Sequence, residues 1–286
     1  MYSAQIANSR GAKISLTGNE TNWQVVSIIG LSPPKAQINT NTVAGMDGAK
    51  FNSSKLLTRN IVITLKLNGE VEANRVMLYQ YFPTKDSCTF YYQNDHRDVY
   101  IEGWVESVEC NFFSNAEVMQ ISILCPQPYF KALDEIVTDI SKVTPRFTFP
   151  FSINIGSPVV ISSLDVSRVT DIINDSTGET GMIIEITFLD DISEVDIINT
   201  ETGEHFALTY QFTTDDVVTI NTNKGQKSVR LTRGGATTDI FTAIELGSTF
   251  FQLRPGDNFF SYTLNAGAAD TDVNIVFKHY TIYRGV

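Results

Sequence analysis

Alternation of apolar and polar residues is the feature that most limits the fold of this 286-residue chain. It is clearest in the run Asn60–Leu67, where every second residue is Ile or Leu. A period of two residues is typical of a strand with one buried and one exposed face. Similar runs at residues 88–92, 99–113, 117–125 and 273–283 predict a mainly β protein.

One segment changes its period and predicts a helix. Val71, Leu78 and Phe82 are separated by seven and four residues, Asn68 can cap the start, and Pro83 ends the run. This spacing predicts a short amphipathic helix near residues 70–82.

The long run at residues 99–113 also changes its register. Ile101 and Val105 have one parity, whereas Val108 and Cys110 have the other. A shift of one residue indicates a β-bulge within residues 103–107.

Charge and turn patterns predict two domains. Residues 1–145 contain 12 Lys and Arg against 14 Asp and Glu, and residues 146–286 contain 9 against 18, so the net charges are −2 and −9. A short helix at Leu133–Ile140 and a linker ending in a Pro-containing segment are expected between them. Turn clusters at regular spacing predict a β-sandwich in the second half: residues 174–178, 200–203, 221–225 and 255–257. We therefore expect domains at residues 1–145 and 146–286.

Composition excludes several classes of protein. A net charge of −11 argues against a nucleic-acid binder, because phosphate contacts need a concentrated basic surface. No apolar run approaches the ~20 residues of a membrane helix, and the start lacks the pattern of a secretory signal. Three widely spaced cysteines, Cys88, Cys110 and Cys125, fit reduced thiols that act as small apolar residues, so we expect folding in a cytoplasm.

Residues able to perform chemistry are scattered. His96, His205 and His279 are the only histidines, and the common hydrolase, dinucleotide and phosphate-loop motifs are absent. Asp270–Asn274 has oxygen-bearing side chains at alternate positions, but its spacing fails for a calcium loop. The carboxylates near residues 190–196 (Asp190, Asp191, Glu194 and Asp196) fit a solvated turn. We predict no catalytic, cofactor-binding or metal-binding residues.

Several local sequences resemble the distal tail protein family of long-tailed bacteriophages. The resemblance extends over nearly the whole chain. In the first half it rests on residues 30–34 (GLSPP), 45–49 (GMDGA), 59–65 (RNIVITL), 99–106 (VYIEGWVE) and 121–130 (ISILCPQPYF). In the second half it rests on residues 149–151 (FPF), 198–204 (INTETGE), 218–222 (VTINT), 253–258 (LRPGDN) and 283–286 (YRGV).

This resemblance implies a tail-tube-like β-domain with one short helix, followed by a galectin-like β-sandwich. It also implies a hexameric ring that joins the tail-tube protein to the tail-tip or baseplate hub proteins, in a virion assembled in a bacterial host. Such a ring subunit is structural rather than enzymatic, needs no cofactor, does not insert in a membrane, and lets DNA pass without specific binding.

Two other functions stay open. A sandwich rich in Phe and Tyr could be a host-surface carbohydrate-binding module, although Trp23 and Trp104 both lie in the first half. A glycosidase would need two carboxylates across a cleft, and nothing in the acidic second half selects a pair.

Individual residues of the first half allow two interpretations each. Gly45, Asp47 and Gly48 fit a tight turn or a ring-contact loop. The pair Pro33–Pro34 fits a stiff extended linker or a docking edge. For Arg59 a solvated or intra-chain ion pair is expected rather than a pair with a neighbouring subunit. The carboxylates with which the first half could line the channel of a ring are Glu70, Glu72, Glu102 and Glu106.

Overall fold

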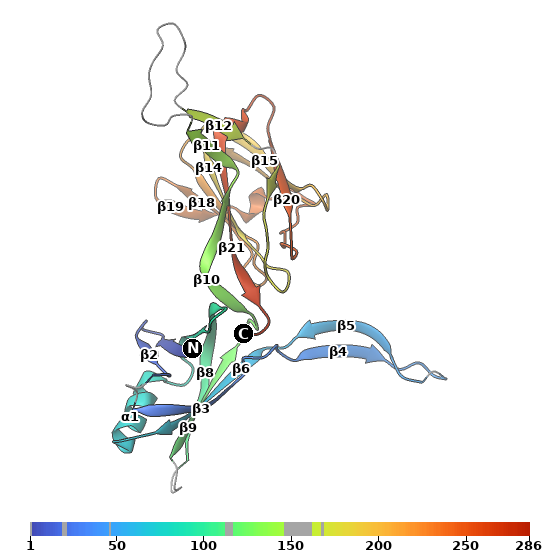
Figure 1. The fold of residues 1–286 in the computed structure, drawn as a ribbon. Coiled ribbons are helices and arrows are strands. Elements are labelled where there is room, and N and C mark those ends of the chain that lie inside the picture. Colours follow the sequence, from blue (N-terminus) through green and yellow to red (C-terminus); the bar gives the residue numbers. More distant parts are fainter. Residues whose placement is uncertain (1, 19–21, 46, 112–116, 146–161, 167–168) are drawn as a thin grey trace. The chain divides into compact units, whose positions relative to one another are not determined.

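The computed structural model describes residues 2–18, 22–45, 47–111, 117–145, 162–166 and 169–286. The chain forms two compact units: unit 1 consists of residues 1–133 and 282–286, and unit 2 of residues 134–281 (Figure 1). The predicted boundary at residues 145/146 lies twelve residues further along and adjoins the segment 146–161, which is outside the described residues. The mainly β fold is as predicted.

Unit 1 is built on an antiparallel sheet, with one helix among its described residues. Its strands follow the order β3-β6-β9-β8 and continue from β8 through β7 to β1 and β2, because β8 pairs with β9 and with β7 along different parts of its length. Its elements are β1 (Ser3–Asn8), β2 (Lys13–Ser15), β3 (Trp23–Ile29), β4 (Ala36–Asn41), β5 (Lys50–Leu56), β6 (Arg59–Leu67), α1 (Val71–Tyr81), β7 (Ser87–Gln93), β8 (Asp98–Cys110) and β9 (Val118–Cys125).

Local predictions for unit 1 are largely confirmed. The strand predicted from Ile61, Ile63 and Leu65 is β6, and these side chains are fully buried. The predicted helix is α1, and the predicted bulge appears as a register shift between Val105 and Ser107 in the pairing of β8 with β9. The strand expected to reach residue 113 ends at Cys110 as β8, and residues 112–116 lie outside the described residues.

The helix predicted at Leu133–Ile140 is wrong. Residues 130–139 form strand β10 (Phe130–Asp139), which pairs with β8 through Lys131 and Ala132. The apolar residues that suggested a helical period include Val137, which is exposed. Pairing with neighbouring strands therefore decided the conformation against the local pattern.

Unit 2 is a sandwich of two antiparallel sheets. One sheet has the order β19-β18-β17-β14-β21 and the other β13-β20-β15-β16. The strands and short helices are β11 (Ser141–Pro145), β12 (Ser162–Val166), β13 (Thr170–Asp171), β14 (Ile183–Phe188), β15 (Ile192–Asn199), β16 (His205–Phe212), β17 (Val217–Asn221), β18 (Ser228–Arg233), β19 (Ala236–Asp239), η1 (Phe241–Ala243), β20 (Phe259–Leu264), η2 (Asp270–Asp272) and β21 (Val273–Tyr283).

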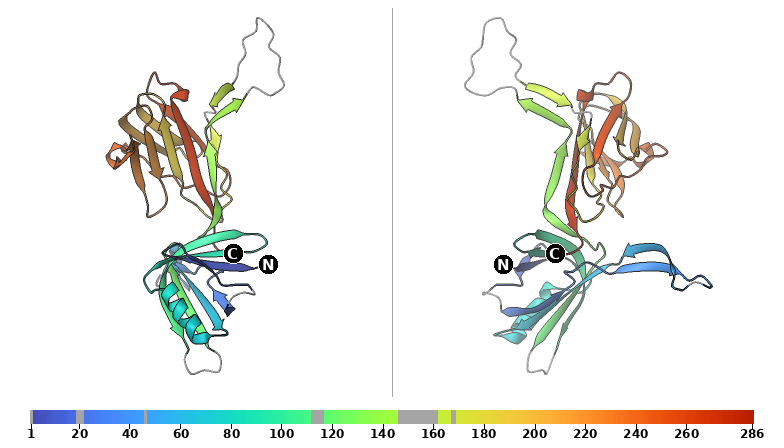
Figure 2. Two further views of the ribbon diagram at one scale, coloured as in Figure 1. Left: turned by 90° about the vertical axis from the view of Figure 1, so that its left-hand side faces the viewer. Right: turned by 45° about the vertical axis from the view of Figure 1, so that its right-hand side comes forward.

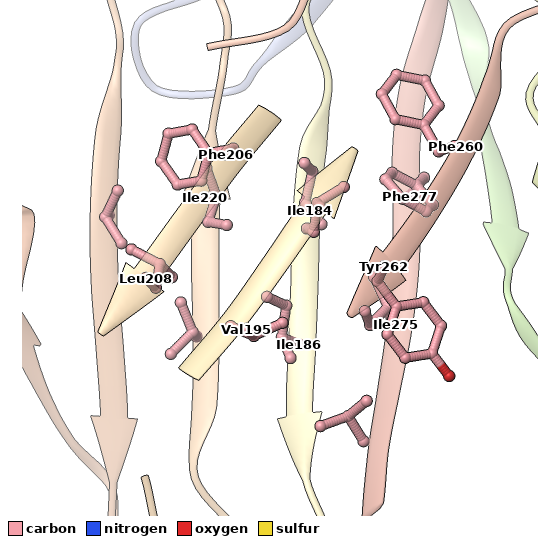
Figure 3. Packing of buried hydrophobic residues seen from close by; sticks show 14 of the residues in the cluster. Ile184, Ile186, Val195, Phe206, Leu208, Ile220, Phe260, Tyr262, Ile275 and Phe277 are labelled. Atoms are coloured by element: carbon pink, nitrogen blue, oxygen red, sulfur yellow. The ribbon is translucent and has the colours of Figure 1, made fainter. Parts of the chain in front are cut away.

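Alternate residues of both sheets meet in the core of unit 2. Figure 3 shows Ile184 and Phe277 of one sheet packed with Phe206 and Phe260 of the other. The rings of Phe260 and Phe277 lie 5.4 Å apart between centroids. This core supports the β-sandwich predicted from the second half.

Candidate interaction surfaces

Arg59, at the start of β6, is buried in unit 1 with only 3% of its surface exposed. Its Nε donates to the carbonyl oxygen of Pro128 at 2.9 Å, and Nη1 donates to that of Ser32 at 2.7 Å. Further hydrogen bonds go to the carbonyl oxygens of Gly30 and Arg284. The solvated or ion-paired arginine expected from the sequence is therefore wrong, because within the described chain Arg59 binds backbone carbonyls.

The four carbonyls belong to three segments that are distant in sequence. Gly30 and Ser32 precede β4, Pro128 lies between β9 and β10, and Arg284 follows β21. The ring of Phe130 lies against the guanidinium, 4.5 Å from its carbon. One cation therefore fixes these three segments of unit 1 to the start of β6.

Residues 282–286 are held in unit 1 by additional contacts. Arg97 stacks on the ring of Tyr283 at 4.4 Å and donates to the carbonyl oxygen of Gly285. The amide of Val286 donates to the carbonyl oxygen of Leu31 at 3.1 Å. A Cβ on Gly285 would lie 2.9 Å from the ring of Pro33, so this segment packs directly on the chain that leads into β4.

Strands β4 and β5 form a separate two-stranded hairpin that we call the ribbon, residues 36–56. It pairs only with itself among the described strands, and nearly all of its described residues are exposed (Figures 1 and 2). Cross-strand pairs place Ala36 opposite Leu56, and Thr40 opposite Phe51. A register shift between Asn39 and Thr40 keeps Phe51 on the same face as Ala36 and Leu56.

The two faces of the ribbon differ in polarity. The apolar face presents Ile38, which is 63% exposed, and Phe51, which is 59% exposed. The other face is polar: Asn39 donates to the Ser53 hydroxyl at 3.0 Å, and Gln37 lies opposite Lys55. An isolated two-stranded hairpin is only marginally stable in water, so an amphipathic one indicates a surface that a partner covers.

The predicted turn at Gly45 and Gly48 lies at the tip of this ribbon. Their φ angles are +82° and +88°, which only glycine adopts without strain. Asp47 is exposed beside them, and Pro33–Pro34 lies between β3 and β4, outside any strand. The tight-turn and extended-linker interpretations therefore agree with the geometry, while contacts by the tip and the proline segment stay predictions.

A second exposed apolar surface lies on the outer face of the sheet β3-β6-β9-β8. Trp104 lies opposite Leu124, and Ile29 lies opposite Val62. The first three residues are 47%, 36% and 63% exposed, and Val62 is half-buried. We call these four residues the apolar stripe.

Polar side chains adjoin the apolar stripe. Glu106 accepts hydrogen bonds from the Ser122 hydroxyl at 2.8 Å and from the Asn60 amide at 3.1 Å. Glu102 precedes Trp104 by two residues and therefore faces the same side of β8. Of the other carboxylates considered for a channel wall, Glu70 occupies the N-cap position of α1, where Asn68 was expected, and its side chain makes no capping hydrogen bond. Glu72 pairs with Arg75. Whether any of the four lines a channel stays a prediction.

The histidines lie far apart in the sequence and serve different local structures. His96 is exposed in the turn between β7 and β8, and its backbone amide donates to Asn94. His205 lies 3.4 Å from the carboxylate of Asp196, whose pKa is raised by burial. His279 is buried, which lowers its pKa, and neither ring nitrogen has a hydrogen-bond partner among the described residues.

The remaining candidates for chemistry form no assembled centre in the described part of the chain, where no group of three His, Cys, Asp or Glu side chains could hold a metal ion. Asp272 accepts a hydrogen bond from the backbone of Ala269, and Asp190 accepts one from Asp191. Burial raises the pKa of the Cys88 and Cys125 thiols to about 12. Cys110 is half-buried, and all three thiols are free.

The described helices are also too short and polar to cross a lipid bilayer.

Comparison with known proteins shows a sequence similarity in the sandwich of unit 2. Residues 175–279 match the family model of the siphovirus-type tail component, C-terminal domain. Most of unit 2 is therefore similar to the C-terminal domain of that family. No curated protein sequence matches the chain.

Solved structures extend the similarity to both units. The crystal structure of Dit from phage SPP1, described as a paradigm of the hub adsorption apparatus in phages infecting Gram-positive bacteria, superposes with a TM-score of 0.67 at 16% identity, covering 97% of this chain and 98% of that chain. A chain of the phage P2 baseplate in its activated conformation with strontium gives 0.54 at 13%, and one with calcium 0.52 at 12%, each covering 98% of both chains. The resemblance to distal tail proteins noted from the sequence is thereby confirmed.

Proposed function

We propose that this chain is a distal tail protein, a structural subunit of the ring at the end of a bacteriophage or prophage tail tube. The observation that carries the proposal is the fold similarity to SPP1 Dit over 97% of the chain, together with the tail-component match of unit 2. Similarity over both units supports a shared architecture better than a match of the sandwich alone, because sandwiches occur with many functions.

In this role six copies form a closed ring between the tail-tube protein and the tail-tip or baseplate hub proteins. A closed ring requires each subunit to present two different surfaces to its two neighbours. Unit 1 presents two different exposed apolar surfaces, the ribbon and the apolar stripe. DNA crosses the channel without specific binding, and the net charge of −11, of which −9 lies in residues 146–286, serves solubility. No chemistry is required of such a subunit, and its site of action is the virion.

Electron microscopy of the particle tests this proposal. We expect density for the chain at the distal end of the tail tube, in six copies around the axis. Antibody labelling of intact particles provides an independent location. Density elsewhere in the particle, or a copy number that does not match a ring, would overturn the proposal.

A carbohydrate-binding function has one structural observation in its favour. Phe241 is half exposed on unit 2 and stacks on Phe250, with 5.9 Å between ring centroids, and Lys227 lies 5.0 Å above the Phe250 ring. An exposed aromatic face can stack on a sugar ring. A glycan array with the full chain and with Phe241→Ala separates the two functions: saturable binding that the substitution abolishes would establish this second one.

A further inference from the structure

We propose that residues 282–286 act as a releasable strap, which binds a site on unit 1 and thereby fixes the base of the ribbon. The base consists of residues 30–35 and 57–58, which connect the ribbon with β3 and with β6. The strap belongs to unit 1, although the chain reaches it only after residues 134–281 of unit 2. This role is independent of the proposed ring, because all of the contacts lie within one copy of the chain.

Two arginines of unit 1 bind the backbone of the strap. Arg59 donates a hydrogen bond to the carbonyl oxygen of Arg284. Arg97 donates one to the carbonyl oxygen of the next residue, Gly285, and its guanidinium carbon lies 4.4 Å from the ring centre of Tyr283. Hydrogen bonds from a charged donor are roughly twice as strong as those between neutral groups. Two cations therefore hold the strap at successive residues.

Gly285 is the residue of the strap that the site selects most strictly. A Cβ at this position would lie 2.9 Å from Cδ of Pro33, 3.0 Å from its nitrogen, and 3.2 Å from the carbonyl oxygen of Leu31. The φ of Gly285 lies outside the left-handed region, so other residues can adopt its backbone conformation. A larger side chain is therefore excluded by contact with the rigid ring of Pro33, and not by backbone strain.

The strap contacts the base of the ribbon directly. The amide of Val286 donates to the carbonyl oxygen of Leu31 at 3.1 Å, and Leu31 and Pro33 lie between β3 and β4. The two segments of the base are joined by the amide of Leu57, which donates to the carbonyl oxygen of Lys35 at 2.9 Å. Among the described strands the ribbon pairs only with itself. The strap therefore supplies part of what fixes the ribbon to unit 1.

Little of the strap is buried. Ile282 is buried, Arg284 is exposed, and the other three residues are half-buried. Segments with little buried apolar surface open locally at a small fraction of the free energy of global unfolding. Because the strap is covalently attached, its effective concentration at the site is on the order of millimolar, so it rebinds readily after opening. The strap thus exchanges between bound and released forms while unit 1 stays folded.

Hydrogen–deuterium exchange of the full chain carrying Gly285→Val tests the strap. The added side chain meets Pro33 and displaces the strap. We expect the amides of Val286 and Leu57 to exchange at least ~10-fold faster than in the unaltered chain, because the first loses its acceptor and the second belongs to the released base. Amides of β6, β9 and the sandwich exchange as before, and tryptophan emission shows that unit 1 is folded.

A peptide with the sequence of residues 279–286, blocked at both ends and fluorescently labelled, tests whether the vacated site recognises the strap. We expect saturable binding to the Gly285→Val chain, measured by anisotropy, and a return of Leu57 amide exchange to that of the unaltered chain. The unaltered chain binds the peptide at least ~10-fold more weakly, because its own strap occupies the site. The matched control peptide carries Gly285→Val and does not bind.

Two results would overturn the proposal. Unchanged exchange of the Val286 amide in Gly285→Val would show that the contact with Pro33 does not select glycine. Unchanged exchange of the Leu57 amide in a chain whose Val286 amide exchanges faster would show that the strap does not fix the base. Neither result bears on the ring function, which is decided by the location and copy number of the chain in the particle.

Arg97→Gln provides a second variant if Gly285→Val fails to fold. It removes both the hydrogen bond to the strap and the stacking on Tyr283, so the same two amides should exchange at least ~10-fold faster. Arg75→Gln is its matched control, since Arg75 also lies over a tyrosine ring, that of Tyr79 on α1, and does not contact the strap. Equal exchange in the two arginine variants would likewise overturn the proposal.

Discussion

Replacing Arg59 should destabilise unit 1 more than any replacement of a surface charge. Its guanidinium donates to carbonyl oxygens of Gly30, Ser32, Pro128 and Arg284, and its side chain is buried. In Arg59→Met the side chain keeps its approximate length but loses all of its donors. Each buried carbonyl left without a donor costs about 1–3 kcal/mol, and the costs are not additive because the segments can relax.

We therefore expect Arg59→Met to lower the free energy of unfolding of unit 1 by about 4 kcal/mol. For a unit of this size that corresponds to a decrease in Tm of roughly 12 °C. Arg59→Lys keeps the charge but loses the planar fork that reaches several carbonyls at once, so its loss should be about half as large, ~2 kcal/mol.

Tryptophan fluorescence isolates the effect. Both tryptophans, Trp23 and Trp104, belong to unit 1, so urea unfolding followed by their emission reports on that unit alone. Circular dichroism reports on both units. Arg75→Met is a matched control, since Arg75 pairs with an exposed Glu72 on α1 and its loss should change little. A midpoint for Arg59→Met equal to that of the unaltered chain would refute the structural role assigned to Arg59.

Three further predictions concern single positions. Gly30 has a φ of +99°, and a Cβ there would lie 2.2 Å from the carbonyl oxygen of Asn60, so Gly30→Ala should lower the free energy of unfolding by at least ~3 kcal/mol in tryptophan-monitored unfolding. The control Gly11→Ala, at a φ of +78° with open space around the Cβ, should lower it by about 1 kcal/mol. Burial lowers the pKa of His279, although the carboxylates of Asp175 and Glu135 act against this shift, so the unfolded chain binds more protons than the folded one. The stability of unit 2 should therefore fall as the pH drops below the ordinary histidine pKa of ~6.5, by up to ~1.4 kcal/mol per pH unit. His279→Gln should flatten this pH dependence in calorimetry. Asp216 is buried, and its carboxylate accepts hydrogen bonds from Arg233 and from the amide of Thr213, so Asp216→Asn should destabilise unit 2 by about 2 kcal/mol in circular dichroism and leave the tryptophan transition unchanged.

Local patterns in the sequence predicted those elements whose burial alternates along the chain. Ile61, Ile63 and Leu65 indicated β6 because its opposite face is polar or half-exposed, and this is the condition under which a period of two is visible. The ribbon was not predicted, since both its faces are exposed and only Ile38 and Phe51 hint at amphipathicity. Exposed strands have no burial pattern to reveal them.

Arg59 shows a different limit of sequence reasoning. An arginine before a strand is ordinarily a surface residue, because a buried cation needs several acceptors. Here the acceptors are backbone carbonyls, which every residue has, so no residue type marks Gly30, Pro128 or Arg284 as a ligand. The sequence contains one partial signal for this arrangement, the glycine at position 30. Only a residue without a Cβ fits there, because the backbone of Asn60 approaches it closely.

The position of the Arg59 contacts connects the stability of unit 1 with the proposed ring function. Gly30 and Ser32 lie between β3 and β4, and therefore fix the point from which the ribbon starts. Ile29, adjacent to Gly30, belongs to the apolar stripe. Arg59 is buried, so it sets the geometry of both exposed surfaces, the ribbon and the apolar stripe, without contacting a neighbour in the proposed ring. Arg59→Lys should then weaken association between copies even in urea-free buffer where the tryptophan signal shows unit 1 folded. Unchanged association of that folded variant would show that the start of the ribbon tolerates displacement, and that Arg59 acts on stability alone.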